Sequence, residues 1–251
     1  MNPCSSDLPG TVGEAMPFLC DGALVTAQAT LGGAALALVL AFAAGLAMLS
    51  PRRLVRVPAR VYMEFFRGTS VIVQMFWIFF ALPVLTGYRL APLAAGILAL
   101  GLNLGAYGAE VVRGGVLAVP RAQREAAIAL NFSPYQRMRY VIMPQALAAM
   151  LPPLNNLLIE LLKATSLVSA ISVGDLIFES KALINSGSDR AVVMVLVMVI
   201  YLLYAGLITA VMRLLERRMA RMLGREVRPL WPRRRRRSAG GELTVAAGGA
   251  R

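Results

Sequence analysis

Long apolar runs alternate with short polar segments along the 251-residue chain. Each run approaches the roughly 20 apolar residues that an α-helix needs to cross a bilayer. A backbone inside lipid must satisfy its own hydrogen bonds, so these runs are predicted to be helices. The sequence therefore predicts an all-α integral membrane protein with about five transmembrane helices. They cover residues 23–49, 69–85, 91–112, 146–162 and 191–212, and the fourth continues less regularly to residue 173.

Charged residues outside the runs give the helices an orientation. Basic residues fill the segments after the first, third and fifth runs, whereas the N-terminal segment, residues 1–21, has acidic residues and no basic one. Because Lys and Arg accumulate in cytoplasmic loops, the N-terminus is predicted outside and the C-terminus in the cytoplasm. The transmembrane region then covers residues 22–220. The tail, residues 221–251, is predicted to be disordered, and its arginines either fix the topology or contact phospholipid headgroups.

Composition excludes several classes of protein. The chain is 58% hydrophobic with a mean hydropathy of +0.66, which exceeds the roughly half apolar content of a soluble domain. Its formal charge of +13 comes from residues beside the apolar runs, so nucleic-acid binding is not expected. The absence of His removes any His-based metal site or general base, and no cofactor is expected. Cys4 and Cys20 precede the first run, and a disulfide between them and two unpaired thiols both remain open.

The segment between the third and fourth runs is too polar to span a membrane. Residues 121–130 are good helix formers, and Asn131 suits a left-handed residue that stops a helix. Ser133 and Gln136 then have the spacing of a capping box for a second helix, which is predicted to end before Pro144. The sequence thus predicts an exposed, compact pair of short helices that could dock into a partner's cleft.

This segment, residues 120–145, resembles the EAA loop of ABC importer permeases. In that motif Glu-Ala-Ala is followed by a Gly and later by Ile-x-Leu-Pro. Asn131 stands here at the glycine, Val141 at the isoleucine and Met143 at the leucine, with the register kept. The resemblance implies that the loop couples the membrane subunit to an ATPase. It assigns that coupling to Glu125, Ala126, Ala127, Asn131 and Pro144.

The resemblance extends over about residues 20–220. Segments 61–69, 109–115 and 162–169 are similar to permeases of the polar amino-acid family, which usually has Pro where Ser70 stands here. Within that family the chain is most similar to ectoine/hydroxyectoine permeases. The implied function is the permease subunit of an ATP-driven, binding-protein-dependent importer of a polar amino acid or compatible solute, preferably ectoine or hydroxyectoine. A glutamine-, glutamate- or histidine-type importer and an ATP-independent secondary transporter are the alternatives.

The resemblance also implies partners. An extracytoplasmic binding protein would deliver the solute, a second, homologous permease would complete the pathway, and two ATPase subunits would supply energy at the bacterial inner membrane. A P-loop needs Gly-x4-Gly-Lys-Ser/Thr to hold phosphates, and neither Lys163 nor Lys181, the only lysines, has that context. The chain itself is therefore not predicted to be an enzyme.

Polar residues within or beside the predicted spans are candidates for the translocation pathway, because charge inside a bilayer is costly. The favoured interpretations are nevertheless structural. Glu110 would reach water or Arg113, and Glu160 and Lys163, three residues apart on one helix face, would form a salt bridge. The amides would hydrogen-bond between helices. The candidates are Gln74, Glu110, Asn155, Glu160, Lys163 and Ser166.

Two further features of the third span concern packing. Gly101 and Gly105 form a small-xxx-small pair, which permits a close helix contact. Asn103 lies between them and is expected to hydrogen-bond to a neighbouring helix.

Overall fold

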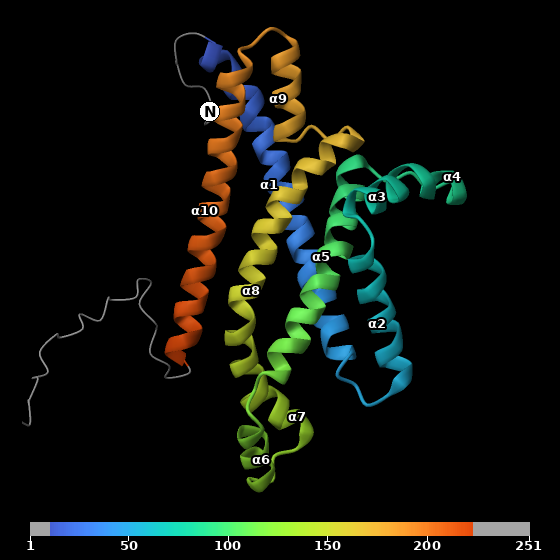
Figure 1. Ribbon diagram of the computed structural model, residues 1–251, viewed down its shortest axis with the longest axis vertical. Coiled ribbons are helices and arrows are strands. Elements are labelled where there is room, and N and C mark those ends of the chain that lie inside the picture. The colour runs from blue at the N-terminus through green and yellow to red at the C-terminus, as the bar shows by residue number, and fades with distance from the viewer. Residues whose placement is uncertain (1–10, 223–251) are drawn as a thin grey trace, which may run out of the picture.

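The computed structural model describes residues 11–222, and the side chains from residue 16 onward. Throughout that part the chain is helical and has no strand. Its long helices form an elongated bundle, with α6 and α7 at one end and α3–α4 projecting sideways (Figure 1). The elements are α1 (Thr11–Ala47), α2 (Arg53–Gly68), α3 (Val71–Phe76), the π-helix η1 (Trp77–Ala81), α4 (Leu82–Thr86), α5 (Pro92–Leu117), α6 (Arg121–Ala129), α7 (Pro134–Gln136), the π-helix η2 (Arg137–Ile142), α8 (Met143–Ala164), the 3₁₀ helix η3 (Thr165–Ile171), α9 (Leu176–Asn185) and α10 (Arg190–Met222).

The prediction of about five spans is confirmed by length and composition. In the described part, four helical stretches are long and apolar enough to cross a membrane, and a bent pair would make a fifth. That pair is Arg53–Gly68 with Val71–Thr86, bent by 104°. The segment predicted as a span over residues 69–85 is helical over Val71–Thr86, but it passes as a span only together with the basic segment before it, which is helix α2.

The start of the first span and the segment after the fourth span also differ from the sequence prediction. α1 begins at Thr11 rather than near residue 23, with Pro17 inside it. Residues 221 and 222 of the tail predicted to be disordered belong to α10, whereas the rest of that tail and Cys4 lie outside the described residues. Cys20 is disulfide-bonded. The mixed segment after the fourth span contains helix α9, whose first turn is capped by Asp175 Oδ1, which accepts the N–H of Phe178 at 3.0 Å.

The second helix of the polar loop does not end before Pro144. The N–H of Met143 donates to the carbonyl of Met138, five residues back, so η2 is a wider, π-type turn. A wider turn leaves room for the pyrrolidine ring and needs no N–H from the proline, so the helix continues into α8. A second π turn, Trp77–Ala81, stands in the same place before Pro83.

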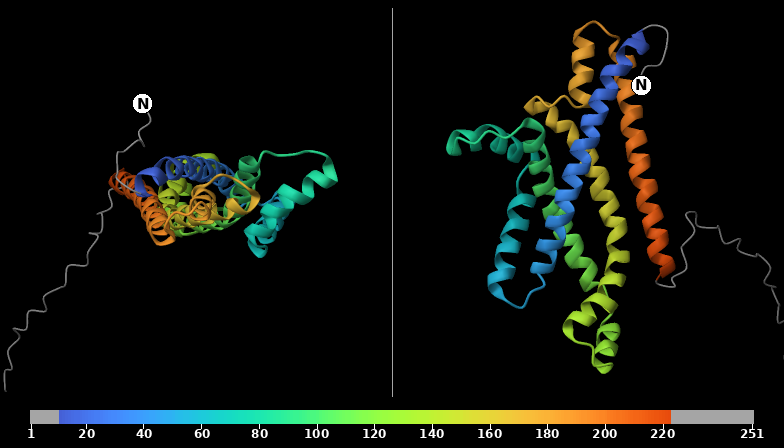
Figure 2. Two further views of the ribbon diagram at one scale, coloured as in Figure 1. Left: turned by 90° about the horizontal axis from the view of Figure 1, so that it is seen from above. Right: turned by 180° about the vertical axis from the view of Figure 1, so that it is seen from behind.

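The core lies between α1 and α5, where glycines let the backbones approach. A Cβ on Gly101 would lie 2.6 Å from Leu36 Cδ2, and one on Gly105 would lie 2.8 Å from Leu40 Cβ. The small-xxx-small prediction is thereby confirmed. Seen from above, the helices form a flat group with α3–α4 at one end and α10 near the other (Figure 2).

Candidate coupling loop and translocation face

The turn after α6 has the geometry that the sequence predicts for Asn131. This residue has φ 58°, in the left-handed region. The N–H of Asn131 donates to Ile128 O at 2.9 Å, and the N–H of Phe132 donates to Ala127 O at 3.0 Å. These two bonds form a Schellman motif, which satisfies the last carbonyls of the helix. Asn therefore replaces a glycine at low cost, because its short polar side chain tolerates this conformation.

A capping box opens α7, again as predicted. The hydroxyl of Ser133 accepts the N–H of Gln136 at 3.3 Å, and the side chain of Gln136 accepts the N–H of Ser133 at 2.8 Å. Both bonds lie within the turn itself, so the loop holds its shape without help from the bundle.

The loop presents a partly apolar surface at the end of the molecule. Glu125 and Ala126 are exposed, whereas Ala127 is buried and Pro144 is half-buried. Four large apolar side chains of the loop also remain exposed: Ile128, Leu130, Tyr135 and Tyr140. Because α6 and α7 lie beyond the end of the long helices (Figure 1), this surface is outside the bundle and suits a protein partner.

Glu110 is paired as the sequence interpretation favours. Its carboxylate accepts two hydrogen bonds from Arg113, at 2.6 Å from Nη2 and 3.3 Å from Nε. Both side chains are partly exposed near the end of α5. Nearby, the guanidinium of Arg67 lies 5.2 Å from the ring centroid of Tyr107, which is a cation–π contact.

Glu160 and Lys163 do not form the expected salt bridge. Within residues 16–222, the ion pair between Glu110 and Arg113 stands alone. Both Glu160 and Lys163 are exposed, and so is Asn156. The residues of α8 that the bundle leaves exposed follow a helical spacing and form what we term the α8 stripe: Ala149, Pro152, Asn156, Glu160 and Lys163.

Two other candidates on or next to α8 lie differently. Ser166 is half-buried at the start of η3, and its hydroxyl donates to the carbonyl of Lys163 at 2.8 Å. Asn155 is half-buried, and its side-chain oxygen is buried without a hydrogen-bond partner among the described residues.

Gln74 belongs to a buried network at the break between α2 and α3. Its amide donates to Phe66 O at 3.0 Å and to Thr69 Oγ1 at 2.5 Å. Asn103 of α5 donates to Phe66 O at 2.9 Å and to Gln74 Oε1 at 3.3 Å. These amides satisfy carbonyls that the 104° bend frees at the end of α2. The network gives Gln74 a structural role, and nothing in its sequence context distinguished that role from one in the pathway.

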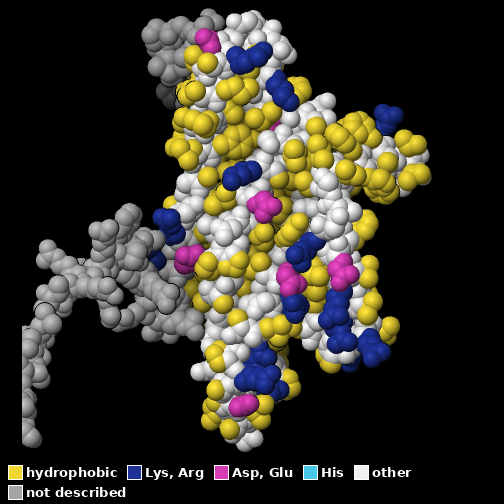
Figure 3. All heavy atoms as spheres, in the orientation of Figure 1, with side chains coloured by type: hydrophobic (Ala, Val, Ile, Leu, Met, Phe, Trp, Pro, Cys, Tyr) yellow, Lys and Arg dark blue, Asp and Glu magenta, His cyan; other side chains and the backbone are white. Residues whose placement is uncertain are grey.

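Charged side chains gather on one face of the bundle. The space-filling view shows basic and acidic groups over α2, α5 and α8 on the same side (Figure 3). Exposed charges on these helices, such as Glu64 and Arg67, lie within or beside the candidate spans. The face is thus too polar to meet lipid along its whole height.

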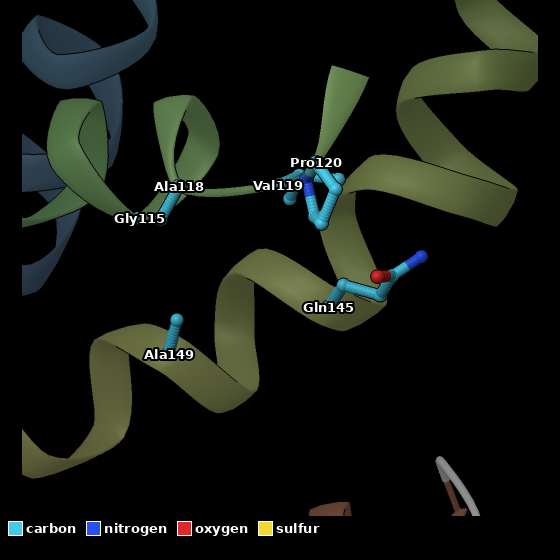
Figure 4. Close-up of a pocket in the computed structure, with 6 residues that line it drawn as sticks. All are labelled: Gly115, Ala118, Val119, Pro120, Gln145 and Ala149. Carbon is cyan, nitrogen blue, oxygen red and sulfur yellow. The ribbon is translucent and has the colours of Figure 1, made fainter. Parts of the chain in front are cut away.

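Two cavities lie among the described helices. A small one of about 50 Å³ separates the end of α5 from the start of α8, between Gly115, Val119 and Gln145 (Figure 4). A larger apolar groove of about 470 Å³ is bordered by α1, α5, α8 and α10. Among the described residues no cluster of three or more His, Cys, Asp or Glu could hold a metal.

A helical membrane bundle with a two-helix loop at one end and a charged face along its candidate spans fits a membrane transport subunit. The chain belongs to the family described as "Binding-protein-dependent transport system inner membrane component", whose model matches residues 16–221. It is therefore a multi-pass inner-membrane protein and not an enzyme, with ATP hydrolysis on a separate ATPase subunit. The family implies an ATPase and a substrate-binding protein as partners.

Known relatives agree with this family. The chain is 46% identical over 208 residues to the probable amino-acid ABC transporter permease protein y4tF of Sinorhizobium fredii, covering 81% of this chain and 87% of the relative. It is 39% identical over 207 residues to the glutamine transport system permease protein GlnP of Escherichia coli, covering 82% and 94%. The solved structure of an amino acid ABC transporter with histidines matches at 28% identity with a TM-score of 0.75, covering 83% of this chain and 97% of that one.

Proposed function

We propose that this chain is a permease subunit of an ABC importer of polar amino acids, in which the α8 stripe faces the solute pathway. The relatives named above carry amino acids in their printed names, including glutamine. The alternative of an amino-acid importer is therefore preferred to the ectoine interpretation, which none of these names supports. The observation that carries the proposal is the exposed, unpaired charge of Glu160 and Lys163 inside a span.

The stripe argues for water or protein on this side of α8. Charged side chains at bilayer depth are rare and almost always face a bundle interior or a water-filled cavity. Glu160 and Lys163 are exposed on the isolated chain, so a second permease subunit or a pathway must cover them. A carboxylate and an ammonium on one helix face also complement the ammonium and carboxylate of a zwitterionic amino acid.

The loop supplies the connection to the ATPase in this proposal. Glu125 and Ala126 are exposed on a helix held by its own caps, and neighbouring apolar side chains are also uncovered. Such a rigid, amphipathic surface suits a cleft in a soluble partner. Two ATPase copies, a second homologous permease and an outward N-terminus complete the proposed assembly.

Uptake by the reconstituted complex tests the solute. The chain, its ATPase and its binding protein would be placed in proteoliposomes with labelled glutamine, histidine, cystine or ectoine. We expect ATP-dependent uptake of an amino acid and no uptake of ectoine. Ectoine as the best solute would overturn the proposal, and uptake without ATP would favour a secondary transporter.

Charge removal on α8 tests the pathway. Lys163→Met and Glu160→Gln are each expected to lower the uptake rate at saturating binding protein by about tenfold, the loss of one charge-assisted hydrogen bond. Lys181→Met is the matched control, because Lys181 is exposed on α9, outside the stripe. If all three variants transport alike, the stripe does not line the pathway.

Charge reversal on α6 tests the coupling. Glu125→Arg should abolish solute-stimulated ATP hydrolysis, because it puts a like charge or an unpaired charge into a docked surface. Gln123→Arg places the same residue on the same exposed helix and should have a smaller effect. Equal effects would mean that the loop responds to added charge anywhere.

A further inference from the structure

Arg124 makes the one side-chain hydrogen bond recorded between α6 and α5 in the described part of the chain. Its Nη2 donates to the carbonyl of Val116 at 2.5 Å. Val116 lies in the last turn of α5, where carbonyls have no partner within the helix. A guanidinium there satisfies such a carbonyl and also opposes the negative end of the helix dipole.

The loop is thus attached to the membrane bundle in two different ways. Toward α8 the chain is continuously helical, because α7, η2 and α8 follow one another without a break. Toward α5 the chain passes through Ala118, Val119 and Pro120, which are not helical. This connection is therefore not held by a continuous helix. The hydrogen bond of Arg124 spans this non-helical connection and links α6 directly to the end of α5.

One donor of Arg124 is unused, and a small cavity lies at the end of α5 to which Arg124 is bound. Its Nε is buried and has no hydrogen-bond partner among the described residues. The small cavity of about 50 Å³ lies between the end of α5 and α8 (Figure 4). At the wall of this cavity, a Cβ on Gly115 would lie 2.5 Å from Met150 Cγ, so α5 and α8 touch there. The two helices therefore have a point of contact at Gly115 with free space beside it.

We propose that Arg124 is a positioning residue that transmits movement of the coupling loop to α5, while α8 receives the same movement through its continuous helix. The proposal rests on the proposed function of the loop. It adds that α6 is coupled to α5 through Arg124, whereas α7 is coupled to α8 through the continuous helix. In it, the unused Nε donor finds an acceptor when α5 shifts into the cavity. Arg124 is not a docking residue, because its side chain points into the bundle and Glu125 next to it is exposed.

The test compares two arginines of the same helix. Arg124→Gln removes the charge and shortens the donor, and Arg124→Lys keeps the charge without the forked geometry. Arg121→Gln removes an equal charge from the exposed start of α6 and serves as the matched control. In proteoliposomes with the ATPase and binding protein, ATP hydrolysed per amino acid transported is expected to rise at least about fivefold for Arg124→Gln, the low end of measured coupling factors. Arg121→Gln should match the wild type, and Arg124→Lys should lie between.

Hydrogen exchange gives a second measurement that needs no transported solute. In the wild-type complex, ATP should change exchange both in residues 121–130 and in residues 112–118. In Arg124→Gln the change in residues 121–130 should persist, while that in residues 112–118 is lost. The proposal would be overturned if Arg124→Gln and Arg121→Gln hydrolysed equal amounts of ATP per amino acid transported. It would also be overturned if Arg124→Gln kept the wild-type change of exchange in residues 112–118. A general rise of exchange across residues 121–130 would also overturn it, because Arg124 would then only stabilise the loop. Failure of every amino acid to be transported would instead reject the proposed function.

Discussion

The two long spans α5 and α10 have similar lengths of apolar sequence and opposite surroundings. In the most apolar stretch of α5, 67% of the residues are buried inside the chain. In that of α10 only 11% are buried, although the stretch is more apolar. α5 reaches its burial with small residues that let α1 approach closely. α10 instead presents large apolar side chains outward, among them Met198, Leu202 and Leu207.

This difference separates two meanings of apolar sequence in a membrane protein. Lipid is as apolar as leucine, so hydrophobicity alone drives no helix against another. Helices associate through shape and hydrogen bonds, which α5 provides with Gly101, Gly105 and Asn103. α10 provides few such features; it packs mainly against α8 and also shares an apolar cluster with α1 and α9. The comparison predicts that equal changes in the two helices have unequal effects.

The largest effect should follow a bulky residue at the α1–α5 contact. A Cβ on Gly108 would lie 2.7 Å from Ala41 Cβ, so Gly108→Leu must push the helices apart. We expect a loss of about 3 kcal/mol or more in the free energy of unfolding, measured by circular dichroism during denaturation in detergent. Gly114→Leu is the control in the same helix, because no atom lies within 4 Å of a Cβ there. Similar losses in both variants would mean that the contact is not close-packed.

The next effect concerns Asp175, which caps α9 where α10 joins the bundle. Burial raises the pKa of its carboxyl from 3.8 to about 6, although the N–H of Phe178 opposes the rise. The protonated form is therefore favoured by folding, so this stability is present below about pH 4 and lost as pH rises through 6. The loss should be about 2.4 kcal/mol between pH 4 and pH 7.5.

Asp175→Asn isolates that contribution. Asn still caps a helix but does not titrate, so the variant should lose most of the pH dependence. Asp189→Asn is the matched control, since Asp189 is an exposed cap whose Oδ1 accepts the N–H of Ala191 at 2.8 Å. If the wild type and Asp175→Asn weaken equally with pH, Asp175 is not the group responsible.

A smaller effect is expected from the polar network that α5 supplies. Asn103→Leu leaves the carbonyl of Phe66 with one donor fewer and the side-chain oxygen of Gln74 unpaired. The expected cost is about 2 kcal/mol, the price of a buried unsatisfied group. Asn185→Leu, at an exposed position of α9, should change the melting temperature little. If the stability of Asn103→Leu equals that of the wild type, water replaces the amide at the α2–α3 break.

Local signals account for most of what the sequence predicts correctly. The left-handed Asn131 and the capping box of Ser133 and Gln136 depend on neighbours within a few residues, so their residue types suffice. The spans follow from length and hydropathy in the same way. Asn103 could be predicted to bond between helices, although its partners Phe66 and Gln74 are set by a bend that no local pattern encodes.

What the sequence missed depends on backbone bonding and on tertiary contacts. Pro144 looks like a helix terminator, and only a shift to π-type bonding at Met138 removes the conflict. The basic residues of α2 are typical of a loop, and the sequence alone did not show that they belong to a helix packed beside α5. Glu160 and Lys163 share a helix face as predicted, yet their side chains remain apart. A three-residue spacing places two side chains on the same helix face. Whether they form a salt bridge depends on which other groups each charge can reach.

The smallest effect is expected in α10, and it completes the comparison. No atom lies within 4 Å of a Cβ on Gly206, so Gly206→Leu should change the free energy of unfolding of the isolated chain by no more than about 0.5 kcal/mol. The same substitution that disrupts α5 at Gly108 would thus pass unnoticed here, because the surrounding hydrocarbon adapts to an added side chain and a packed helix does not. A loss as large as that of Gly108→Leu would mean that this side of α10 is covered by protein, and the contrast between the two spans would then belong to the isolated chain alone.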